Sequence, residues 1–360
     1  MTIRDQRQQE FADVWINKGE WGIIYACPRF GKIYVTINIL EKKFYKNVLI
    51  AYPDLKIKAS WEADLAKRGY ADSLITYTTH LSLKKHIDEQ YDLIILDEIH
   101  LLSAAQIEVV KLMKVKNRVI LGLTGTMTSD TKKWLLTNLH LPVVVTYTID
   151  QGISEGIIAD YDITVIKVLL DTTTLQVYKK QRKTEKKQFD MLSYVVNKQQ
   201  AEGRDTMFMR LARMRIIQNS LAKRNATRKL IRENMDKRIL VFCGVTAVAD
   251  DLLIPSHHSK SGGKELFDAF VKGQHGVNHI AVCKIGNTGV TYAALNYVII
   301  NYFSSSGEDM AQKINRCMSF EYDNPDKKSH IYIISTNEPI ELSWLTKALE
   351  FFDKTKIKYL

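Results

Sequence analysis

The sequence predicts an α/β protein with two tandem domains, each containing a doubly wound parallel sheet. The chain has 360 residues, which is long for one domain and comfortable for two. Short runs of β-branched and aliphatic residues alternate with stretches of helical periodicity, a pattern typical of parallel sheets covered by helices. Hydroxyl, glycine and acidic residues collect where several of these runs end, and open α/β sheets place their ligands at that edge.

In the first half of the chain, hydrophobic periodicity predicts one N-terminal helix and five strands. The expected helix covers residues 3–20, and the expected strands cover residues 22–26, 47–52, 74–77, 93–96 and 118–123. Helical stretches separate most of the strands, so we expect the strands to pair in parallel.

The segment between the first strand and the next helix has the order of a phosphate-binding loop. In such a loop, amides at the helix start cradle phosphates and a lysine, here Lys32, reaches the β and γ groups. Ala26 replaces the usual first glycine, and Ile33 replaces the usual Ser or Thr. An ordinary strand-to-helix turn therefore remains compatible with this segment.

The strand over residues 93–96 is followed by Asp97, Glu98 and His100. Its run of aliphatic residues is typical of a strand buried on both faces, where charge without a partner is costly. A divalent metal and an attacking water would account for both acids. Asp97 would hold Mg²⁺, mainly through water, and Glu98 would polarise the nucleophilic water for phosphoryl transfer.

The second half of the chain repeats the alternation after a connector rich in turn residues. Its expected elements are a strand at 163–169, a mostly helical segment at 174–236, strands at 238–243, 279–283 and 297–302, a helix at 264–272 and a closing helix with a basic tail within 336–360. We therefore place a first domain at 1–148, a linker at 149–162 and a second domain at 163–360.

Composition places the protein among ordinary globular chains, with 46% hydrophobic and 25% charged residues. The sequence has no apolar run of 18 or more residues, and its polar start does not resemble a signal peptide. We therefore expect no membrane association and a cytoplasmic location. The four cysteines are scattered without paired metal-ligand spacing, which indicates a reduced intracellular protein without structural zinc.

The net charge of +11 is concentrated in one region. Residues 179–238 contain 18 Lys or Arg against 6 Asp or Glu, so the rest of the chain is close to neutral. A basic surface of this kind suits a polyanion such as nucleic acid. A solvated helical face would give the same count, and charge alone leaves both interpretations open. Arg210, Arg213 and Arg215 are our candidates for contacts with nucleic acid.

Several segments resemble the motifs of superfamily-two, DEAD/DEAH-like helicases and translocases, nearest to the Snf2-like and phage recombination-helicase branches. The segments similar to motifs I, II and III are Pro28–Lys32, Asp97–His100 and Leu123–Thr126, in that order. Tyr52-Pro53 with Trp61-Glu62 is similar to motif Ia, residues 286–291 to motif V, and residues 312–316 to motif VI. Residues 4–11 are similar to the adenine-reading Q motif, with Gln8 preferred over Gln6 and Gln9.

This resemblance implies two RecA-like domains that bind ATP and Mg²⁺, and it implies a role for each matching residue. The implied catalytic residues are Lys32, Glu98, Gln312 and Arg316, the last acting as an arginine finger. The implied nucleotide-binding residues are Gln8, Pro28, Arg29, Phe30, Gly31, Lys32, Ile33, Asp97 and Gly289, with the amides of 28–32 on the phosphates. The implied coupling residues are His100, Thr124 and Thr126, and the implied nucleic-acid contacts are Pro53, Thr78, Thr79, Thr288 and Thr291.

Two departures from the family pattern affect the expected activity. Ile33 stands where a Ser or Thr hydroxyl helps to hold Mg²⁺, and Ser319 stands where motif VI has a second arginine. We expect a slow or metal-demanding ATPase rather than an inactive one, because Lys32, Asp97, Glu98 and Arg316 are all present.

The function that this pattern predicts is an ATP-dependent DNA helicase or translocase of the recombination, repair or replication type. The resemblance also suggests a phage origin. The expected partner is single-stranded, branched or duplex DNA, with RNA less favoured, and a monomer is favoured. The alternatives are a branch-migrating duplex translocase, an RNA helicase and a nucleic-acid-binding protein with a weakened site.

Overall fold

The computed structural model describes residues 1–70, 74–115, 119–178, 181–260, 263–274, 276–283, 290, 292–321, 324 and 326–360. The chain divides into two compact units, Met1–Ala159 and Asp160–Leu360. Each unit contains one large sheet in which every pairing is parallel. The predicted α/β class with doubly wound parallel sheets is therefore confirmed.

The sheet of the first unit has six strands in the order β3-β2-β5-β7-β1-β8. Its strands are β1 (Trp21–Ala26), β2 (Val48–Tyr52), β3 (Ile75–Thr79), β5 (Leu93–Asp97), β7 (Ile120–Thr124) and β8 (Val143–Tyr147). A short separate ladder joins β4 (Gln90–Tyr91) to β6 (Lys114–Val115). The central strand β5 is buried along its whole length, as its aliphatic run predicts.

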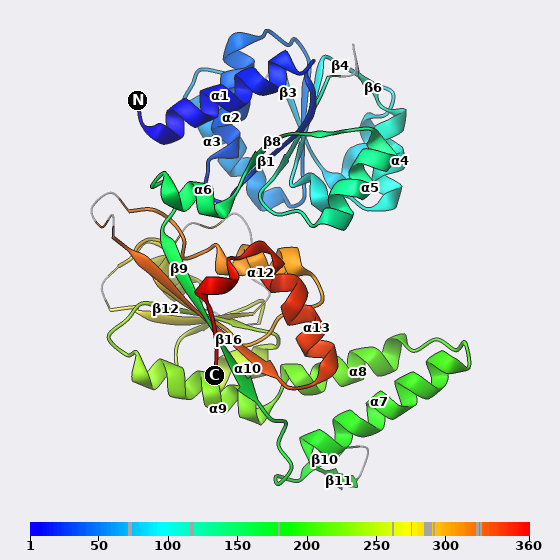
Figure 1. Ribbon diagram of the computed structural model, residues 1–360, viewed down its shortest axis with the longest axis vertical. Coiled ribbons are helices and arrows are strands. Elements are labelled where there is room, and N and C mark those ends of the chain that lie inside the picture. Colours follow the sequence, from blue (N-terminus) through cyan, green and yellow to red (C-terminus); the bar gives the residue numbers. More distant parts are fainter. Residues whose placement is uncertain are drawn as a thin grey trace. The chain divides into compact units, whose positions relative to one another are not determined.

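Helices cover both faces of this sheet. They are α1 (Ile3–Asn17), α2 (Lys32–Lys42), α3 (Lys58–Ala66), α4 (Ala104–Leu112), α5 (Ser129–Leu139) and α6 (Ile149–Ser154), with 3-10 turns η1 (Leu55–Ile57), η3 (His80–His86) and η4 (Ile99–Leu101). In Figure 1, α1, α2 and α3 lie on one side of the sheet, and α4 and α5 lie on the other. Ile107 of α4 and Leu135 of α5 share a core cluster with Ile94 and Leu96 of β5.

The predicted linker 149–162 is structured rather than extended. Its first residues form helix α6, which the Thr148 side chain caps by accepting a hydrogen bond from the Gln151 amide. Arg7 of α1 donates to both carboxylate oxygens of Glu155 at 3.0 and 2.6 Å, and the Tyr147 hydroxyl donates to the same group at 2.8 Å. These bonds hold the start of the expected connector against the first unit.

The sheet of the second unit has seven strands in the order β13-β14-β12-β15-β16-β9-β17. They are β9 (Asp160–Val168), β12 (Ile239–Cys243), β13 (Ser256–His257), β14 (His279–Cys283), β15 (Tyr297–Ile300), β16 (Lys328–Thr336) and β17 (Ile357–Tyr359). The basic tail expected after the closing helix thus includes a strand, which pairs with β9. Its lysines alternate with Ile357 and Tyr359, a period-two pattern that a count of charges overlooks.

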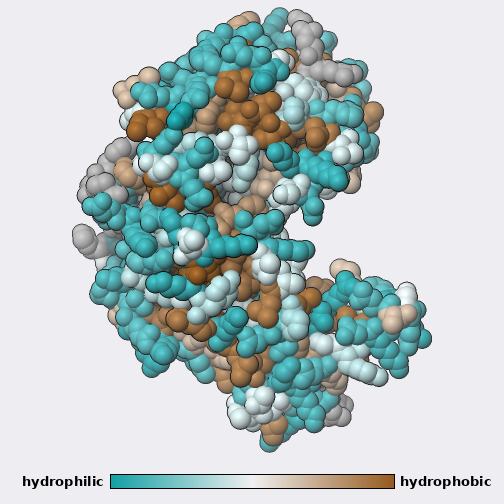
Figure 2. Space-filling model, viewed as in Figure 1, coloured by the Kyte–Doolittle hydropathy of each residue, from teal (hydrophilic) through white to brown (hydrophobic). Residues whose placement is uncertain are grey.

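The basic segment 174–236 is mostly helical, as predicted: it contains three long helices, preceded by a small antiparallel hairpin. The hairpin pairs β10 (Gln176–Tyr178) with β11 (Gln181–Lys183), and the long helices are α7 (Glu185–Ala201), α8 (Met207–Gln218) and α9 (Leu221–Glu233). In Figure 1, α7 and α8 lie side by side as a helical hairpin. Figure 2 shows the surface of this hairpin as mostly hydrophilic, with isolated hydrophobic residues.

The remaining helices of the second unit are short. They are α10 (Thr246–Asp250), α11 (Lys264–Val271), α12 (Gly307–Ile314) and α13 (Pro339–Ala348), with 3-10 turns η6 (Leu349–Phe351) and η7 (Lys354–Lys356). Within the described part of the chain, no helix combines the length and the apolar character needed to cross a membrane.

A buried ion pair fixes α9 and α13 to the second sheet. The side chains of Lys223 on α9 and Glu341 on α13 are both 0% exposed and in contact. Lys223 Nζ also donates to the Asn301 carbonyl at 3.1 Å, and Glu341 Oε2 accepts from the amide and hydroxyl of Thr336 at 2.7 and 2.6 Å. Asn301 follows β15 and Thr336 ends β16, so this network joins two helices to two strands.

Replacing Lys223 with Met should lower the free energy of unfolding by about 3–5 kcal/mol, because Glu341 would stay buried without its cation. Urea unfolding of the intact chain measures this loss. The double variant K223M/E341Q should recover part of it, since no charge then remains unpaired.

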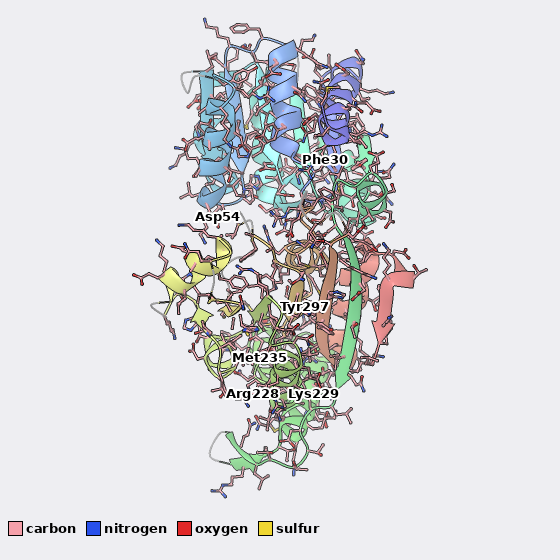
Figure 3. All side chains as sticks on the ribbon, turned by 90° about the vertical axis from the view of Figure 1, so that its left-hand side faces the viewer. Phe30, Asp54, Arg228, Lys229, Met235 and Tyr297 are labelled. Carbon is pink, nitrogen blue, oxygen red and sulfur yellow. The ribbon has the colours of Figure 1, made fainter. Side chains whose placement is uncertain are left out.

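The matched control is Lys229→Met on α9, where Lys229 is labelled beside Arg228 in Figure 3. Lys229 pairs with Glu233, but its side chain is 69% exposed. Losing this exposed pair should cost less than about 1 kcal/mol. Equal decreases in the free energy of unfolding for both variants would mean that the buried pair stabilises the protein no more than the exposed pair does.

Candidate functional site

The carboxyl ends of the strands of the first sheet lie at one edge, and most of the predicted site residues follow them. In the strand register, Asp97 of β5 pairs with Leu123 of β7, and Thr124 of β7 pairs with Tyr25 of β1. The loop after β1 therefore lies beside the residues that follow β5 and β7. This adjacency brings Lys32, Asp97 and Glu98 together, although they are distant in sequence.

The loop over residues 27–32 turns sharply into α2. Arg29 and Gly31 have left-handed backbone angles, with φ of 67° and 88°. Gly31 is the N-cap of α2 and offers no side chain to the first amides of the helix, and the Tyr34 amide donates to the Gly31 carbonyl at 2.9 Å. Among the described residues, the Lys32 and Ile33 amides are the N–H groups left open to a ligand at this helix start. Pro28 has no N–H, and the Phe30 amide donates to the Cys27 carbonyl at 3.3 Å, so neither can be counted among the expected phosphate-binding amides of 28–32. Phosphate binding by the other amides stays a prediction.

Lys32 points from the start of α2 toward the acids. Its Nζ lies 3.6 Å from Glu98 Oε1. Gly125 also borders the lysine: a Cβ atom added to Gly125 would stand 2.9 Å from Lys32 Nζ and 3.3 Å from Pro28 Cγ. Only glycine fits at this position without displacing the lysine.

Glu98 adopts a left-handed backbone conformation, with φ of 48°. Its carboxylate accepts a hydrogen bond from the Gly125 amide at 3.3 Å and lies 3.4 Å from His100 Nδ1. Burial acts to raise the pKa of Glu98, but Lys32, His100 and the Gly125 amide outweigh it, and the pKa is lowered. The structure thus keeps this carboxylate ionised and directed toward Lys32 and Gly125.

Asp97 is buried beside Glu98. Its Oδ2 accepts a hydrogen bond from the indole N–H of Trp61 at 3.0 Å, and its Oδ1 accepts one from the Glu98 amide at 3.0 Å. Burial, followed by the charge of Glu98, raises the pKa of Asp97 to about 6, while Lys32 opposes the shift. A cation next to Asp97 would therefore relieve an unfavourable charge.

The residues around Asp97 fit Mg²⁺ held through one carboxylate. Among the described residues, no group of three or more His, Cys, Asp or Glu side chains could hold a metal. Mg²⁺ commonly uses one or two carboxylates together with water and substrate phosphates, rather than a cage of protein ligands. Asp97 next to a loop with open amides meets that requirement.

His100, Thr124 and Thr126 form a connected set behind the acids. His100 Nδ1 lies 2.8 Å from the Thr124 hydroxyl, which donates to the Thr126 carbonyl at 2.7 Å. All three side chains are almost completely buried. His100 Nδ1 also lies 3.4 Å from Glu98 Oε2, so these contacts connect the acid to the residues after β7. The coupling role of the three residues stays a prediction.

Two residues predicted to bind nucleotide support the loop from behind. Gln8 is buried, and its amide nitrogen donates to the carbonyl oxygens of Phe30 and Gly31 at 2.8 and 3.3 Å. The Phe30 ring is buried against Phe11 and Tyr147, each with its centroid 5.0 Å away. The adenine contact of Gln8 stays a prediction, and the Phe30 side chain acts within the core.

The predicted nucleic-acid contacts of the first unit also follow its strands. Pro53 comes directly after β2, Thr78 and Thr79 end β3, and Tyr52 pairs with Thr79 in the register. Thr78 is buried, whereas Pro53 and Thr79 are half-buried. These three residues therefore share the sheet edge that carries Asp97.

The predicted residues of the second unit are only partly described. Gln312 lies on α12, and Arg316 follows that helix with its Nη1 donating to the Val290 carbonyl at 2.9 Å. Thr288, Gly289 and Thr291 lie outside the described residues. Next to Ser319, Lys327 donates to the Ser319 carbonyl at 3.1 Å and to Glu321 at 2.6 Å.

The three candidate arginines lie on α8. Arg210 and Arg215 are exposed and Arg213 is half-buried. Within the part of the chain that is described, none of the three has a carboxylate partner, whereas Arg224 and Arg228 of α9 both pair with Asp251.

Sequence reasoning missed Trp61 and Gly125 as members of the site. The motif Ia segment contains Trp61, but its distance of 36 residues from Asp97 conceals the hydrogen bond. Gly125 lies between the two threonines of the motif III segment, and a glycine between two polar residues at a strand end is itself a signal of close approach.

The chain resembles known proteins in part of its sequence and in its fold. Residues 3–129 match the family described as "Type III restriction enzyme, res subunit". A fragment assigned to an HsdR subunit of a type I restriction enzyme from Vibrio vulnificus YJ016 has a TM-score of 0.64 and 15% identity, over 98% of this chain and 67% of that chain. No curated protein matched the sequence.

Two helicase-type structures extend the comparison. The Hef helicase domain from Pyrococcus furiosus has a TM-score of 0.55 and 13% identity, over 97% of this chain and 100% of that chain. Dbp5 from S. cerevisiae, bound to RNA and ADP BeF3, has a TM-score of 0.61 and 10% identity, over 98% and 89%. The predicted RecA-like fold and the resemblance to superfamily-two helicases are confirmed, while the Snf2-like and phage branches stay predictions.

Replacing Trp61 with Phe should lower the free energy of unfolding by about 1–3 kcal/mol, because a buried carboxylate loses its N–H donor. A double-mutant cycle with Asp97→Ala, followed by urea unfolding without divalent ions, isolates the hydrogen bond from the change in ring size. The control is Trp21→Phe, since the Trp21 indole donates at 2.8 Å to the His140 carbonyl in an exposed setting. A coupling energy near zero would mean that Trp61 only fills space.

Proposed function

We propose that this chain, which has the fold of superfamily-two helicases, is a nucleic-acid-dependent ATPase that uses hydrolysis to move on or remodel DNA. The observation that carries the proposal is the approach of Lys32 to Glu98 beside the buried Asp97, at the carboxyl edge of a parallel sheet. Phosphoryl transfer depends mainly on positioning and on stabilising charge, and these three residues are the types it requires.

Each residue of the first unit has a defined task in this proposal. Lys32 and the open amides at the start of α2 would bind the β- and γ-phosphates of ATP. Mg²⁺, held by Asp97, would neutralise phosphate charge. Glu98, kept ionised by Lys32 and aligned by the Gly125 amide, would orient the attacking water. Trp61 would keep the Asp97 carboxylate in one orientation.

Gln312 and Arg316 are our candidates for residues of the second unit that act on the γ-phosphate. We also propose that Ile33 and Ser319 make the ATPase slow, since each replaces a residue that would add a contact to the metal or the phosphates. A nucleic-acid-binding protein without hydrolysis is the second candidate, and Ile33 is the residue that favours it.

DNA is our preferred partner. The matched family is described as a subunit of restriction enzymes, and Arg210, Arg213 and Arg215 present charge without carboxylate partners among the described residues. Grip on a strand would come mainly from phosphate contacts, for which Pro53, Thr78 and Thr79 are candidates in the first unit.

The wild-type protein should hydrolyse ATP faster when DNA is added, and Glu98→Gln should lower this stimulated rate by about 10²–10⁴-fold, because the base that orients water is lost. The assay compares single-stranded, duplex, forked and four-way DNA with RNA. The control is Glu108→Gln, an exposed glutamate on α4 whose side chain is 65% exposed. Binding of nucleic acid without stimulated turnover on any substrate would establish the second candidate instead.

Charge reversal at Arg210, Arg213 and Arg215 should weaken DNA binding and flatten its dependence on salt, because fewer phosphates would be neutralised. The slope of log affinity against log salt should fall by about one for each lost phosphate contact. A salt series of fluorescence anisotropy titrations measures it. Reversing Lys229, Arg232 and Lys237 gives the same change in charge elsewhere. An unchanged slope would assign the α8 arginines to a solvated face.

A further inference from the structure

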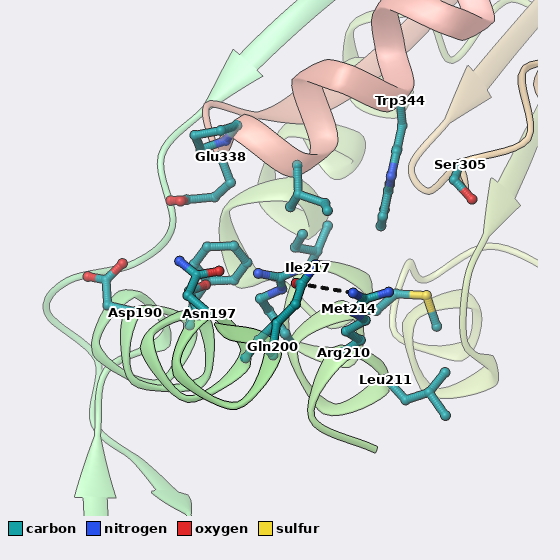
Figure 4. A pocket seen from close by; sticks show the side chains of 16 residues that line it. Asp190, Asn197, Gln200, Arg210, Leu211, Met214, Ile217, Ser305, Glu338 and Trp344 are labelled. Atoms are coloured by element: carbon teal, nitrogen blue, oxygen red, sulfur yellow. Dashed lines mark hydrogen bonds between the residues drawn. The ribbon is translucent and has the colours of Figure 1, made fainter. Parts of the chain in front are cut away.

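A groove of about 870 Å³ lies between the α7–α8 hairpin and α13 in the second unit. Figure 4 shows its sides: Gln200 and Asn197 come from α7, Arg210 and Met214 from α8, and Trp344 from α13. The volume is within the range of sites that hold small ligands or parts of larger ones.

The floor and one side of the groove are apolar. Phe189 and Ile217 belong to a buried core cluster, and Ile340 of α13 packs against it. Trp344 is half-buried and borders the same space. Such surfaces bind flat, apolar groups well, because an aromatic ring can stack on a partner and shield it from water.

The charges around the groove are not balanced. Asp190 and Glu338 are acidic, but Lys186 binds both, at 2.6 and 3.2 Å. Arg210 donates to the neutral Gln200 at 3.2 Å, and the Arg213 guanidinium lies 5.9 Å from the centre of the Phe189 ring. In the part of the chain that the structure describes, these two arginines therefore face the groove without a carboxylate.

The two arginines also affect each other. Burial, and then the charge of Arg210, lowers the pKa of Arg213. Two neighbouring guanidinium groups at the rim of an apolar groove would be stabilised by an anion, and arginine is well suited to phosphate because its N–H groups form a planar fork.

We propose that this groove binds unpaired bases of a single-stranded nucleic acid, with a base against Trp344 and the adjoining phosphates on Arg210 and Arg213. The inference rests on the proposed function and adds a second, base-contacting site to it. Base stacking is tolerant of sequence, so the groove would hold a displaced strand without reading it.

An acidic peptide with an aromatic side chain is the competing occupant. The nucleic acid is favoured because the basic excess extends over the whole segment 179–238, beyond the groove itself. Phe208 of α8 is 76% exposed and Arg215 is also exposed, so aromatic and cationic groups continue along the helix outside the groove. A nucleic-acid strand, in which bases alternate with phosphates, matches this succession of aromatic and cationic groups.

The test measures binding of a fluorescent oligothymidylate of about twelve nucleotides, a length suited to single-strand sites, and of an abasic oligomer of the same length. The variants of the full chain are Trp344→Leu, which keeps an apolar side chain but removes the ring, and the pair R210Q/R213Q. The pair K229Q/R232Q on α9 is the matched control for the loss of two positive charges, because both residues are exposed. Trp344→Phe retains a ring and decides the result if Trp344→Leu unfolds at a lower temperature than the wild type.

Trp344→Leu should weaken binding of the base-bearing oligomer by roughly tenfold to a hundredfold and leave the abasic oligomer nearly unaffected. The arginine pair should weaken both oligomers, and Trp344→Phe should bind close to the wild type. Wild-type affinity in both Trp344→Leu and R210Q/R213Q would overturn the inference. So would equal weakening of both oligomers by Trp344→Leu, or binding to an acidic aromatic peptide that these variants abolish while oligomer binding persists.

The two levels of the proposal fail in different ways. If DNA stimulates ATP hydrolysis but the groove variants bind oligothymidylate like the wild type, only the groove assignment is wrong. If the wild type shows no stimulated hydrolysis although Trp344→Leu selectively weakens binding of bases, the groove assignment holds and the ATPase proposal fails.

Discussion

Two adjacent carboxylates at the end of a buried strand cannot both remain ionised unless positive charge and hydrogen-bond donors lie close to them. The first unit meets this constraint asymmetrically. Lys32 and the Gly125 amide favour the ionised form of Glu98. Burial raises the pKa of Asp97, although Trp61 and the Glu98 amide donate hydrogen bonds to its carboxylate. Glu98 is therefore stabilised as a carboxylate, whereas the negative charge of Asp97 is unfavourable until a cation binds next to it.

The rest of the first unit serves this arrangement. The parallel register places the loop after β1 beside the residues that follow β7. Glu98 has a left-handed backbone, and its carboxylate lies by Lys32 and the Gly125 amide. The absence of a side chain at Gly125 lets Lys32 approach. Gln8 and Phe30 stabilise the loop from the opposite side, so the lysine is held by packing as well as by charge.

The sequence was sufficient to predict the fold class, which depends on local patterns. It also singled out Lys32, Asp97 and Glu98, which the structure brings together, while their roles stay predictions. Aliphatic runs predict buried strands, and acids directly after such a run have few structural explanations. The bond between Trp61 and Asp97 could not be predicted, since it joins α3 to β5. The number of basic residues in 179–238 also overstates the positive charge at the surface, because Lys223 is one of them and is completely buried. Composition does not distinguish a surface cation from one inside the core.

Strand β17 has a consequence for how the protein behaves in solution. The strand β9 is nine residues long, and β17 pairs with its Ile163, Thr164 and Val165. Without that cover, a long row of backbone N–H and C=O groups would face the solvent and could pair with another molecule. The lysine-bearing β17 forms a short, charged border in its place. Loss of the pairing between β17 and β9 should therefore promote association of the protein at high concentration.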